Sequence, residues 1–554
     1  TELAAEEAQL EIPHEHPVHY FLAKNAKLHP FQVIMRDAAD GKSFTFFKTY
    51  LAAILFSREI RKMTPSDSKY VGVLLPNSTA AVISIMGCLL ADKVPCPLNF
   101  TTSQEILELS IRKAKIKLVL TNRLFLTKVR LTPTPEMVFL EDVAKRVPMW
   151  KKIMTMLSII LIPYKELINM LAPLTHDDNN AEAVLLFSSG TTGIPKGVRL
   201  THHNLFADVF AETQAISFDP KRDGIFGNLP LFHSFGINTG LWLPFIIRSR
   251  PVIYVHSPLD AALIGDAIVK YKVPILVATP SFLQTYLRKF KPEVFDVLRL
   301  VVSGAEKLRS DVAENFHRAV GGKLEIVEGY GCTELSPVVT FNMALNGQDT
   351  GRICGKKGAI GQGLETVCTR IMDPLSFKPV APDAEGLLFI KGPMVMQGYL
   401  DDPEQSAKVL LDGYYNTGDI AKMDEHGFVT ICGRLSRFSK IAGEMVPHEM
   451  VECIINELCG LENRVVAVSC IPDAQKGEAL LVLYTPETPL TPDQIVAELR
   501  ERSISNLWIP KASNFEPVDS LPILGSGKLD LQVLHRLADE VAAKRQALAG
   551  QKKG

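Results

Sequence analysis

The sequence lacks an excess of charge of either sign, because 60 Lys and Arg residues face 61 Asp and Glu residues. This balance excludes a general nucleic-acid binder, which presents a basic surface. The nine cysteines include no pair at CxxC spacing, which argues against a zinc site or a disulfide framework and predicts reduced cysteines in a cytoplasmic protein. Repeats and low-complexity tracts are also missing. We therefore expect an ordinary globular protein.

The chain has no secretory signal, and it begins at Thr1 without a methionine. From this start we expect that an upstream segment has been removed. What is present is a chain of 554 residues with 47% apolar and 22% charged residues. That length is too great for one compact core, so two or more domains are predicted.

One apolar segment, 147–173, suggests a membrane, but its apolar core is about half the roughly 20 residues that a spanning helix needs. Pro163 also interrupts it. Two readings remain: an amphipathic helix lying in the membrane interface, or, as we favour, a helix docked on the protein's own core. The residues at helical spacing that define its apolar face are Met149, Ile153, Met156, Leu157 and Ile160.

Buried strands alternate with helical patterns over the first four hundred residues, which predicts α/β architecture with two mainly parallel sheets flanked by helices. Near 340–433 the pattern changes to short strands with glycine turns, which predicts a small β-rich subdomain. We expect an N-terminal domain over 1–433, a hinge at 434–437 and a small, mobile α+β C-terminal domain over 438–554. The strands predicted most clearly are 71–75, 118–120, 183–187, 276–278 and 300–303.

A loop of glycine, hydroxyl residues and lysine follows the strand at 183–187. Its glycines allow close approach of backbone N–H groups to an anion, its hydroxyls add donors, and its lysine adds charge. The spacing is not that of a Walker A loop, so a triphosphate is predicted without a P-loop fold. The loop reads Ser188-Ser189-Gly190-Thr191-Thr192-Gly193-Ile194-Pro195-Lys196.

Six further motifs follow in order along the chain. They are 229–236 (LPLFHSFG), 303–306 (SGAE), 328–334 (EGYGCTE), 415–419 (YNTGD), 433–440 (GRLSRFSK) and 521–528 (LPILGSGK). With the loop at 188–196, this series resembles the adenylate-forming superfamily of acyl-CoA synthetases, luciferases, nonribosomal adenylation domains and acyl-carrier-protein synthetases. The resemblance extends from about residue 20 to 535. It implies ATP and Mg²⁺ as cofactors, and an acyl-adenylate that is then transferred to a thiol.

The resemblance also implies roles for the motif residues in nucleotide binding. Tyr330 stacks on adenine, Thr333 donates to the α-phosphate, and Glu334 holds Mg²⁺, a hard cation that takes one or two carboxylates and shares phosphate oxygens. Asp419 accepts from the ribose hydroxyls, and Arg434 also contacts the ribose. The residues assigned to the phosphates and to the adenine face are Ser188, Ser189, Gly190, Thr191, Thr192, Gly193, Lys196, Gly304, Ala305, Glu306, Glu328 and Gly329.

Five residues carry the catalytic part of the resemblance. Lys528 reaches the acyl carboxylate and the α-phosphate during adenylation, and His233 lies beside the acid. A rotation of the C-terminal domain then brings Lys440 and Gly443 to form a thiol channel with His233. Ser436 lies where relatives carry a hinge Asp or Lys, so charge-based behaviour of the hinge is not expected here.

The acid and the thiol are less sharply defined. Residues 232–236 contain no acidic or strongly basic side chain, and no Asp is placed to anchor an α-amine, so a medium- or long-chain fatty acid is predicted. The segment 438–446 resembles fatty acyl-acyl carrier protein synthetases, including the ligase half of bifunctional acyltransferases. Acyl carrier protein is therefore the expected partner, with CoA as the alternative. A third hypothesis is a catalytically silent relative that binds nucleotide.

Carrier proteins are acidic, so basic side chains near these motifs are candidate docking charges. The alternative is that these side chains form an ordinary solvent-exposed surface without a docking role. The residues concerned are Arg434, Arg437, Lys440 and the pair Lys151-Lys152.

Overall fold

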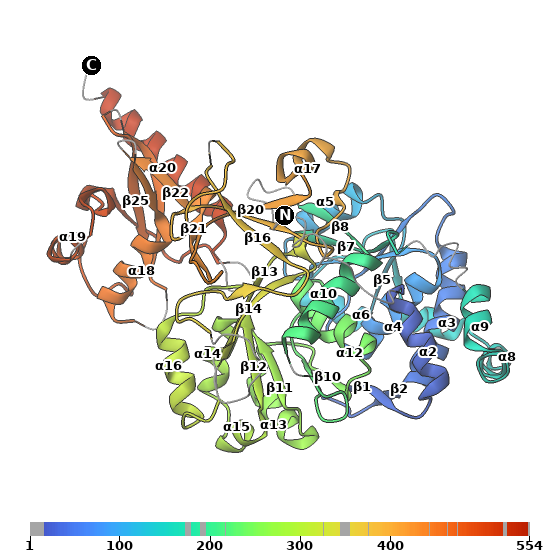
Figure 1. Ribbon diagram of the computed structural model, residues 1–554. Coiled ribbons are helices and arrows are strands. Elements are labelled where there is room, and N and C mark those ends of the chain that lie inside the picture. Colours follow the sequence, from blue (N-terminus) through green and yellow to red (C-terminus); the bar gives the residue numbers. More distant parts are fainter. Residues whose placement is uncertain are drawn as a thin grey trace. The chain divides into compact units, whose positions relative to one another are not determined.

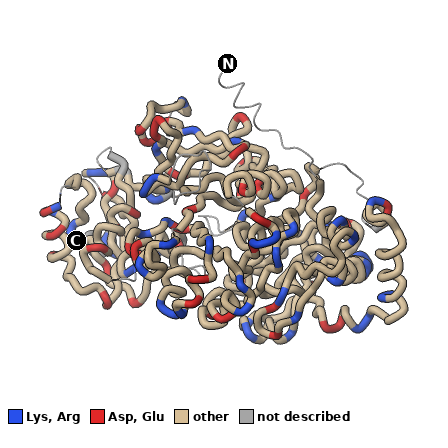
Figure 2. The backbone as a smooth tube through the Cα atoms, turned by 60° about the horizontal axis from the view of Figure 1, so that its bottom comes forward, with Lys and Arg blue, Asp and Glu red and all other residues tan. Residues whose placement is uncertain are grey.

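The computed structural model describes residues 16–171, 179–188, 195–216, 218–324, 326–343, 355–374, 376–441, 444–461, 464–473, 475–502, 504–523 and 529–551. They fall into two compact units (Figure 1). Among the described residues, the first unit holds 16–188, 195–369 and 390–415, and the second holds 370–389 and 416–551. Basic and acidic residues are interspersed along the backbone (Figure 2), in line with the balanced net charge.

An all-parallel sheet in the first unit has the strand order β4-β3-β5-β6. Three of its four helices begin at polar caps: the side chains of Ser78, Ser103 and Asn122 each accept a hydrogen bond from a backbone N–H three residues further on. The strands are β3 (Tyr70–Val73), β4 (Val94–Pro97), β5 (Val119–Thr121) and β6 (Met137–Phe139), and the helices are α4 (Thr79–Leu90), α5 (Gln104–Lys113), α6 (Arg123–Val129) and α7 (Leu140–Lys145).

Two mixed sheets contain the remaining parallel pairs of this unit. In the sheet with the order β2-β1-β10-β9, the strands β1, β10 and β9 run parallel to one another. In the sheet with the order β11-β12-β13-β14-β15, the strands β11, β12 and β13 run parallel to one another. The strands are β1 (Val33–Asp37), β2 (Ser43–Thr45), β9 (Phe226–Gly227), β10 (Val252–Tyr254), β11 (Ile275–Ala278), β12 (Leu300–Gly304), β13 (Ile326–Gly331), β14 (Val338–Asn342) and β15 (Gln362–Gly363). The helices are α13 (Ala261–Tyr271), α14 (Pro280–Leu287), α15 (Pro292–Val297) and α16 (Ser310–Ala319). The α/β prediction is confirmed, with parallel pairing spread over three sheets instead of two.

The strand before the phosphate loop forms an antiparallel hairpin with the strand after it. β7 (Glu182–Ser188) pairs with β8 (Lys196–Thr201), and β8 pairs with β18 (Gly398–Tyr399). Lys196 is the first residue of β8, so the hairpin fixes the position of its backbone opposite Ser188. The helices nearby in the chain are α10 (His202–Ala215), α11 (Ser234–Ile237), the π-helix η1 (Asn238–Trp242), α12 (Leu243–Ile246) and α17 (Pro403–Val409).

Four helices form the N-terminal part of the first unit: α2 (Val18–Leu28), α3 (Phe46–Met63), α8 (Met149–Leu161) and α9 (Tyr164–Leu171). The predicted helix at 147–173 is confirmed as α8 and α9, but the apolar face of α8 is exposed, and only Thr155 and Ile159 of that helix are buried. The favoured reading of a helix docked on the core holds for the side of α8 that carries Thr155 and Ile159, whereas the apolar residues singled out in the sequence do not contribute to that docking. Among the described residues, no helix is long and apolar enough to cross a membrane.

A further sheet, antiparallel from β19 through β20 to β21, lies in the predicted β-rich stretch of the sequence. Its order is β16-β17-β20-β19, and β21 pairs with β20. The pairing of β20 with β21 places Asp419 opposite Arg434. The strands are β16 (Cys368–Met372), β17 (Gly386–Lys391), β19 (Leu410–Leu411), β20 (Tyr414–Met423) and β21 (Val429–Arg434).

The C-terminal part of the second unit is the predicted α+β fold, with the sheet order β23-β22-β25-β24 and β26 paired to β25. Aliphatic residues of α18, α19 and these strands form its core. The predicted hinge at 434–437 includes η3 (Leu435–Arg437), and its hinge role stays a prediction. The elements are β22 (Phe438–Ile441), β23 (Glu444–Pro447), α18 (His448–Cys459), β24 (Val466–Asp473), β25 (Gly477–Tyr484), α19 (Pro492–Glu501), β26 (Phe515–Pro517) and α20 (Leu531–Gln551).

Arg437 corrects one sequence-based expectation. It is not a solvated docking charge, because its side chain is buried within the second unit. The guanidinium donates to the Glu452 carboxylate over 2.6 Å and to the backbone carbonyl of Val468 over 3.0 Å. A buried arginine with a carboxylate partner is structural, so Arg437 anchors the chain after β21 to the C-terminal fold.

Candidate active site

Two predicted nucleotide motifs lie at the carboxyl ends of β12 and β13, which are neighbouring parallel strands. Their register places Ser303 opposite Glu328 and Gly304 opposite Gly329. A Cβ atom on Gly304 would lie 2.8 Å from the carbonyl oxygen of Gly329, so only glycine fits at this close approach. Ala305 follows with φ of +68°, a left-handed backbone conformation that is costly for a residue with a side chain. Ligands of α/β folds bind at this edge of a sheet, so both motifs lie where a site is expected.

The acidic residues of these motifs have hydrogen-bond partners of their own. Ser281 Oγ donates to Glu306 Oε2 over 2.6 Å, and the Leu308 backbone N–H donates to Glu328 Oε1 over 3.3 Å. Burial raises the pKa of Glu328. These contacts tie the turn after β12 to the start of α14 and to the end of β13.

The segment after β13 carries Tyr330, Thr333 and Glu334. Tyr330 is half-buried near the end of the strand, and the other two belong to the short 3-10 helix η2 (Thr333–Leu335). The hydroxyls of Thr333 and Ser234 lie 3.3 Å apart. Glu334 is buried, and Tyr399 Oη donates to its Oε1 over 3.0 Å. This segment therefore lies against both the loop of His233 and the strand β18.

Two tyrosines lie at the Glu334 carboxylate, and a lysine lies over the ring of one of them. Tyr399 is hydrogen-bonded to Tyr415 as well as to Glu334, and Lys196 Nζ lies 5.1 Å from the centroid of the Tyr399 ring. Burial, followed by the charge of Glu334, raises the pKa of both tyrosines, so both stay neutral donors. The Met396 N–H also donates to the Glu334 backbone carbonyl over 2.9 Å. The Tyr399 hydroxyl thus orients the Glu334 carboxylate, and the face of the same ring lies next to the Lys196 cation.

The loop of His233 is held by a buried asparagine. Asn77 Nδ2 donates to the Leu229 carbonyl over 2.6 Å, and its Oδ1 accepts from the Leu231 N–H over 2.9 Å. A Cβ on Gly236 would lie 2.8 Å from the Leu229 carbonyl oxygen, so glycine is required where the chain folds back on itself. His233 directly precedes α11 at its N-cap position. The predicted acid-binding loop is therefore a rigid turn.

Two buried carboxyl groups lie behind this loop. Asn238, in the π-helix after α11, donates through Nδ2 to Asp208 Oδ2 and to Glu212 Oε1, each over 2.8 Å. The Val338 N–H donates to Asp208 Oδ1 over 2.9 Å. Burial raises the pKa of Glu212 to about 8 and, with the neighbouring Glu212, raises the pKa of Asp208 well above its usual range. π-Helices often mark functional segments, and this one is tied to α10 and β14 by neutralised acids.

The predicted ribose residues belong to the second unit and lie together there. Arg434 Nε donates to Asp419 Oδ1 over 2.7 Å across the β20–β21 pair. Asp419 is buried, whereas the Arg434 side chain is half exposed. The antiparallel register explains why two motifs that are 15 residues apart in the sequence meet.

Several predicted site residues lie outside the described residues, and their roles stay predictions. For Ser436 in η3 and Lys440 in β22 the structure describes the backbone only. The residues outside the description are Ser189, Gly190, Thr191, Thr192, Gly193, Gly443 and Lys528.

The donor set fits a magnesium–nucleotide complex. Within the described residues, no group of three or more His, Cys, Asp or Glu side chains converges on one point, so no all-protein metal cage is present there. Mg²⁺ normally takes one or two carboxylates and completes its shell with phosphate oxygens and water, for which Glu334 suffices. Among the described residues, Ser303 Oγ and Glu306 Oε1 of the adenine turn are buried without a hydrogen-bond partner. Unsatisfied buried polar atoms of this kind suit a polar ligand.

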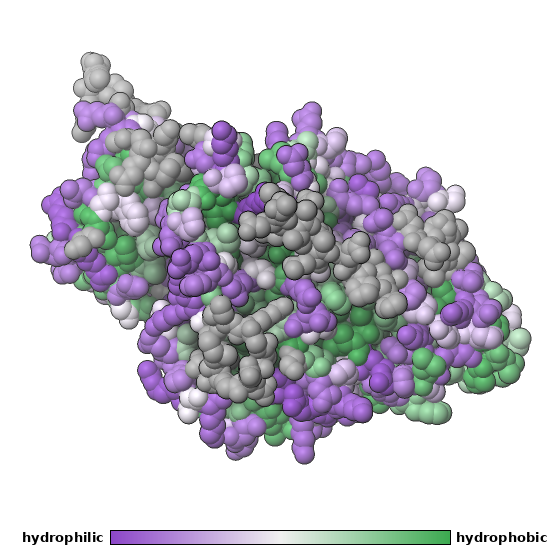
Figure 3. Space-filling view, in the orientation of Figure 1, coloured by the Kyte–Doolittle hydropathy of each residue, from purple (hydrophilic) through white to green (hydrophobic). Residues whose placement is uncertain are grey.

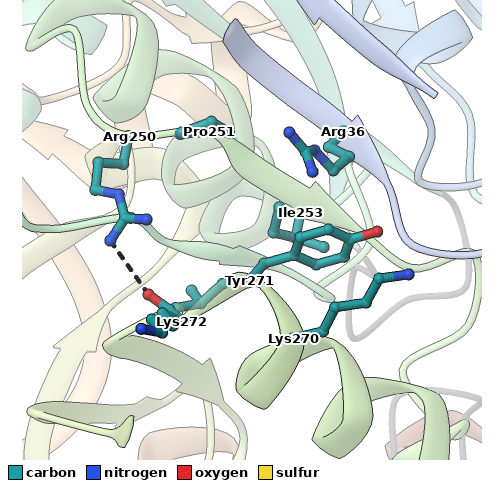
Figure 4. A pocket seen from close by; sticks show the side chains of 9 residues that line it. Arg36, Arg250, Pro251, Ile253, Lys270, Tyr271 and Lys272 are labelled. Carbon is teal, nitrogen blue, oxygen red and sulfur yellow. Dashed lines mark hydrogen bonds between the residues drawn. The ribbon is translucent and has the colours of Figure 1, made fainter. Parts of the chain in front are cut away.

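A separate cavity of about 280 Å³ lies in the first unit and contains none of the predicted site residues (Figure 4). Arg36 and Lys270 flank Tyr271, at 4.8 and 5.1 Å from its ring centroid. Arg250 donates to the backbone carbonyl of Lys272 over 3.4 Å. These cations are engaged with the tyrosine ring and with a carbonyl, so the cavity does not take part in the candidate site.

Sequence reasoning missed Tyr399, Asn77 and the Asn238–Asp208–Glu212 cluster. The pair Asp208 and Glu212 did carry a signal, because these two acids lie four residues apart among the apolar residues in the middle of α10. Tyr399 and Asn77 gave no such signal in the sequence, because each is a single polar residue whose hydrogen-bond partner is distant in the chain.

Comparisons with known proteins agree with the resemblance to adenylate-forming enzymes. The family model described as AMP-binding enzyme matches residues 22–400. The long-chain-fatty-acid–CoA ligase of Bacillus subtilis is 28% identical over 94% of this chain and 95% of its own length. The feruloyl-CoA synthase of an Amycolatopsis species is 30% identical over 62% of this chain and 68% of its own length.

The fold comparison agrees. The o-succinylbenzoate–CoA synthetase of Bacillus subtilis, solved with ATP and magnesium ion, superposes with a TM-score of 0.75 at 20% identity, over 93% of this chain and 98% of that one. The predicted cofactors, ATP and Mg²⁺, agree with this nucleotide-binding fold. The family model covers more than half of the chain, and two of the ordered motifs meet at the ends of β12 and β13. The chain belongs to the AMP-binding enzyme family.

Proposed function

We propose that the chain is an AMP-forming fatty acid–CoA ligase. A carboxylate oxygen first attacks the α-phosphorus of ATP, and the bond to pyrophosphate breaks. The CoA thiol then attacks the acyl carbonyl carbon, loses its proton and displaces AMP. The observation that carries this proposal is the 3.3 Å contact between Ser234 and Thr333. It joins the loop expected to bind the acid to the segment expected to bind the α-phosphate.

The chain's own residues hold the phosphates and fix the reacting groups in place. Magnesium, when bound, neutralises charge on the phosphate oxygens. Glu334 supplies one carboxylate for that ion, and Tyr399 orients it through a 3.0 Å hydrogen bond. Lys196 contributes positive charge beside the same ring. Charge stabilisation of this preorganised kind is what phosphoryl chemistry needs most.

An apolar acid suits the loop of His233. From residue 230 to 247 only His233 can carry a charge. Phe100 packs edge-on against Phe125 and Phe232, with ring centroids 5.0 and 4.9 Å apart. The buried acids behind the loop have raised pKa values, so they do not offer a fixed negative charge to an α-amine. A fatty acid is therefore favoured, and ferulate serves as the aromatic comparison.

CoA is the acceptor that we propose, because both curated relatives described above are named for CoA thioesters. Acyl carrier protein is the second candidate, supported by the resemblance of 438–446 to acyl-ACP synthetases. One of its proposed docking charges, Arg437, is buried and is removed from that argument. The remaining basic residues on the second unit that support it are Arg434 and Lys440.

The exchange of two lysines between half-reactions is part of the proposal. Lys528 serves adenylation, and Lys440 with Gly443 serves thiol transfer after rotation at 434–437. Arg437 fits such a pivot because its side chain is fixed to Glu452 within the C-terminal fold. The reaction is placed in the cytoplasm, where the eight free cysteines of the described residues would stay reduced.

The test uses purified full chain with ATP, Mg²⁺ and labelled palmitate, and with CoA or holo-acyl carrier protein as acceptor. We expect AMP, pyrophosphate and acyl-CoA, with ferulate a poorer acid. Glu334→Ala is the matched inactive variant. Acyl transfer to the carrier protein but not to CoA would replace the first acceptor with the second. Nucleotide binding without pyrophosphate release would instead favour the catalytically silent hypothesis.

A further inference from the structure

Helix α8 presents its apolar side to solvent. All eight of its exposed large apolar residues have between 36% and 74% of their surface exposed. At 100° per residue they cover an arc of about 160° on the helix. Figure 3 shows hydrophobic side chains gathered over this helix, at the lower right of the view. We call these residues the α8 apolar face: Met149, Trp150, Ile153, Met154, Met156, Leu157, Ile160 and Leu161.

The opposite side of α8 attaches it to the first unit. Thr155 and Ile159 are buried there, and Arg58 of α3 donates to Thr155 Oγ1 over 2.8 Å. The usual arrangement of a surface helix is thereby reversed, because apolar residues normally face the core. Pro148 precedes the helix and Pro163 follows it, so α8 is a separate element with fixed ends. An apolar surface of this size marks an interaction site.

The stretch of chain that carries this face, between Asp142 and Glu166, contains charges of one sign only. From Val143 to Lys165 the chain has five Lys or Arg residues and no Asp or Glu. On the helical projection Lys151 and Lys152 lie on either side of the apolar arc, next to the buried side. Lys27 of α2 adds a further cation at the far end, where its Nζ donates to the Ile160 carbonyl over 2.8 Å. An apolar face bordered by cations is complementary to an anionic lipid surface.

We propose that α8 docks this protein in the interfacial layer of a bilayer that contains anionic lipid. The α8 apolar face enters the acyl boundary, and Lys151, Lys152 and Lys27 contact lipid phosphates. With 13 residues the helix is too short to span, so it lies along the surface. This inference does not depend on the proposed ligase activity, although a fatty acid dissolved in the same bilayer would lie close to the enzyme.

A bilayer explains this surface better than an acidic carrier protein does. A carrier protein would be recognised through paired charges, whereas the exposed area of α8 is mainly methionine, leucine and isoleucine. Trp150 at the start of the helix is half exposed and lies next to Lys151, whose Nζ is 5.7 Å from the ring centroid. Tryptophan beside lysine is typical of the water–lipid boundary.

The test is sedimentation of the purified full chain with sucrose-loaded vesicles. One set contains phosphatidylcholine alone and the other adds phosphatidylglycerol. We expect binding to the phosphatidylglycerol vesicles that weakens as salt rises, and a blue shift of tryptophan emission that Trp150→Phe removes. The double variant Ile153→Asp, Leu157→Asp should lower the vesicle partition coefficient by about tenfold or more. Lys151→Glu with Lys152→Glu should remove the preference for phosphatidylglycerol.

The matched control is Leu124→Asp with Leu259→Asp. Both leucines, at 80% and 68%, are more exposed than Ile153 and Leu157, at 46% and 40%, but they lie outside α8. This control should bind vesicles like the wild type, and all variants should keep the wild-type melting temperature. Equal losses in the control and the α8 variant would overturn the proposal, and so would failure of the wild type to sediment. If the α8 variant changes the oligomeric mass without changing vesicle binding, a second copy covers the face and the bilayer proposal is wrong.

Discussion

Glu212 offers a perturbation whose sign and size follow from one buried carboxyl group. It lies in α10 with 4% of its surface exposed and accepts a hydrogen bond from Asn238. Glu212→Gln keeps the size and the acceptor oxygen but removes the titratable proton. Because burial raises the pKa of Glu212 from 4.5 to about 8, the folded chain binds this proton more tightly than the unfolded chain does.

The pH dependence follows by linkage. Between pH 4.5 and about 8 the native state holds more protons at this site, so the free energy of unfolding falls as pH rises. The stabilisation is fully present below pH 4.5, and it is lost as the pH rises through the pKa of Glu212 in the folded chain, about 8. Between about pH 5 and about pH 8 the loss amounts to about 3 kcal/mol. Glu212→Gln should lack the part of this loss that Glu212 causes, so the variant should gain up to about 3 kcal/mol over wild type across that interval, while Asp208, whose pKa burial also raises, still titrates.

Urea unfolding, followed by the fluorescence of Trp242, measures the free energy of unfolding of the unit that contains Glu212. Trp242 ends the π-helix and is fully buried, and Trp150→Phe and Trp508→Phe in all samples leave it as the single reporter. Glu314→Gln, on the exposed surface of α16, is the matched control and should track wild type at both pH values. If Glu212→Gln and wild type lose stability in parallel as pH rises, the reasoning about this buried acid is refuted.

Three further predictions concern the candidate site. Tyr399→Phe removes the hydrogen bond to Glu334 and should slow adenylation by about 10- to 100-fold, with a higher Mg²⁺ requirement in pyrophosphate exchange; an unchanged Mg²⁺ profile would contradict this. Lys528→Ala should abolish adenylation and spare thiol transfer from synthetic acyl-adenylate, whereas Lys440→Ala should do the reverse; equal loss of both steps in either variant would refute the two-lysine model. Asn77→Leu strands two buried backbone groups and should lower stability by about 2–4 kcal/mol in urea unfolding, a loss that a purely surface role would not produce.

The sequence predicted those parts of the fold that depend on local pattern. The run at 300–303 became β12 (Leu300–Gly304) because a short apolar stretch bounded by turn residues has few alternatives to a buried strand. The motifs at 303–306 and 328–334 were assigned separately to the nucleotide, and the parallel pairing of β12 with β13 brings them to the same edge of the sheet. Asp419 and Arg434 were assigned separately to the ribose, and a hairpin register joins them.

Contacts between distant segments could not be predicted in this way. Periodicity correctly identified α8 as a helix with an apolar face, but it says nothing about what covers that face, and the structure leaves it exposed. Arg437 was read as a solvated charge because its partner, Glu452, lies in another helix. Tyr399 is 65 residues from Glu334, and a lone tyrosine in a strand gives no sign of such a partner.

The most direct test of the central claim is fatty-acid-dependent exchange of labelled pyrophosphate into ATP, measured without any acceptor thiol. The account predicts exchange that requires both Mg²⁺ and the acid, is lost in Glu334→Ala and yields AMP when CoA is added. Formation of ADP and phosphate, or exchange that proceeds without the acid, would contradict an acyl-adenylate mechanism.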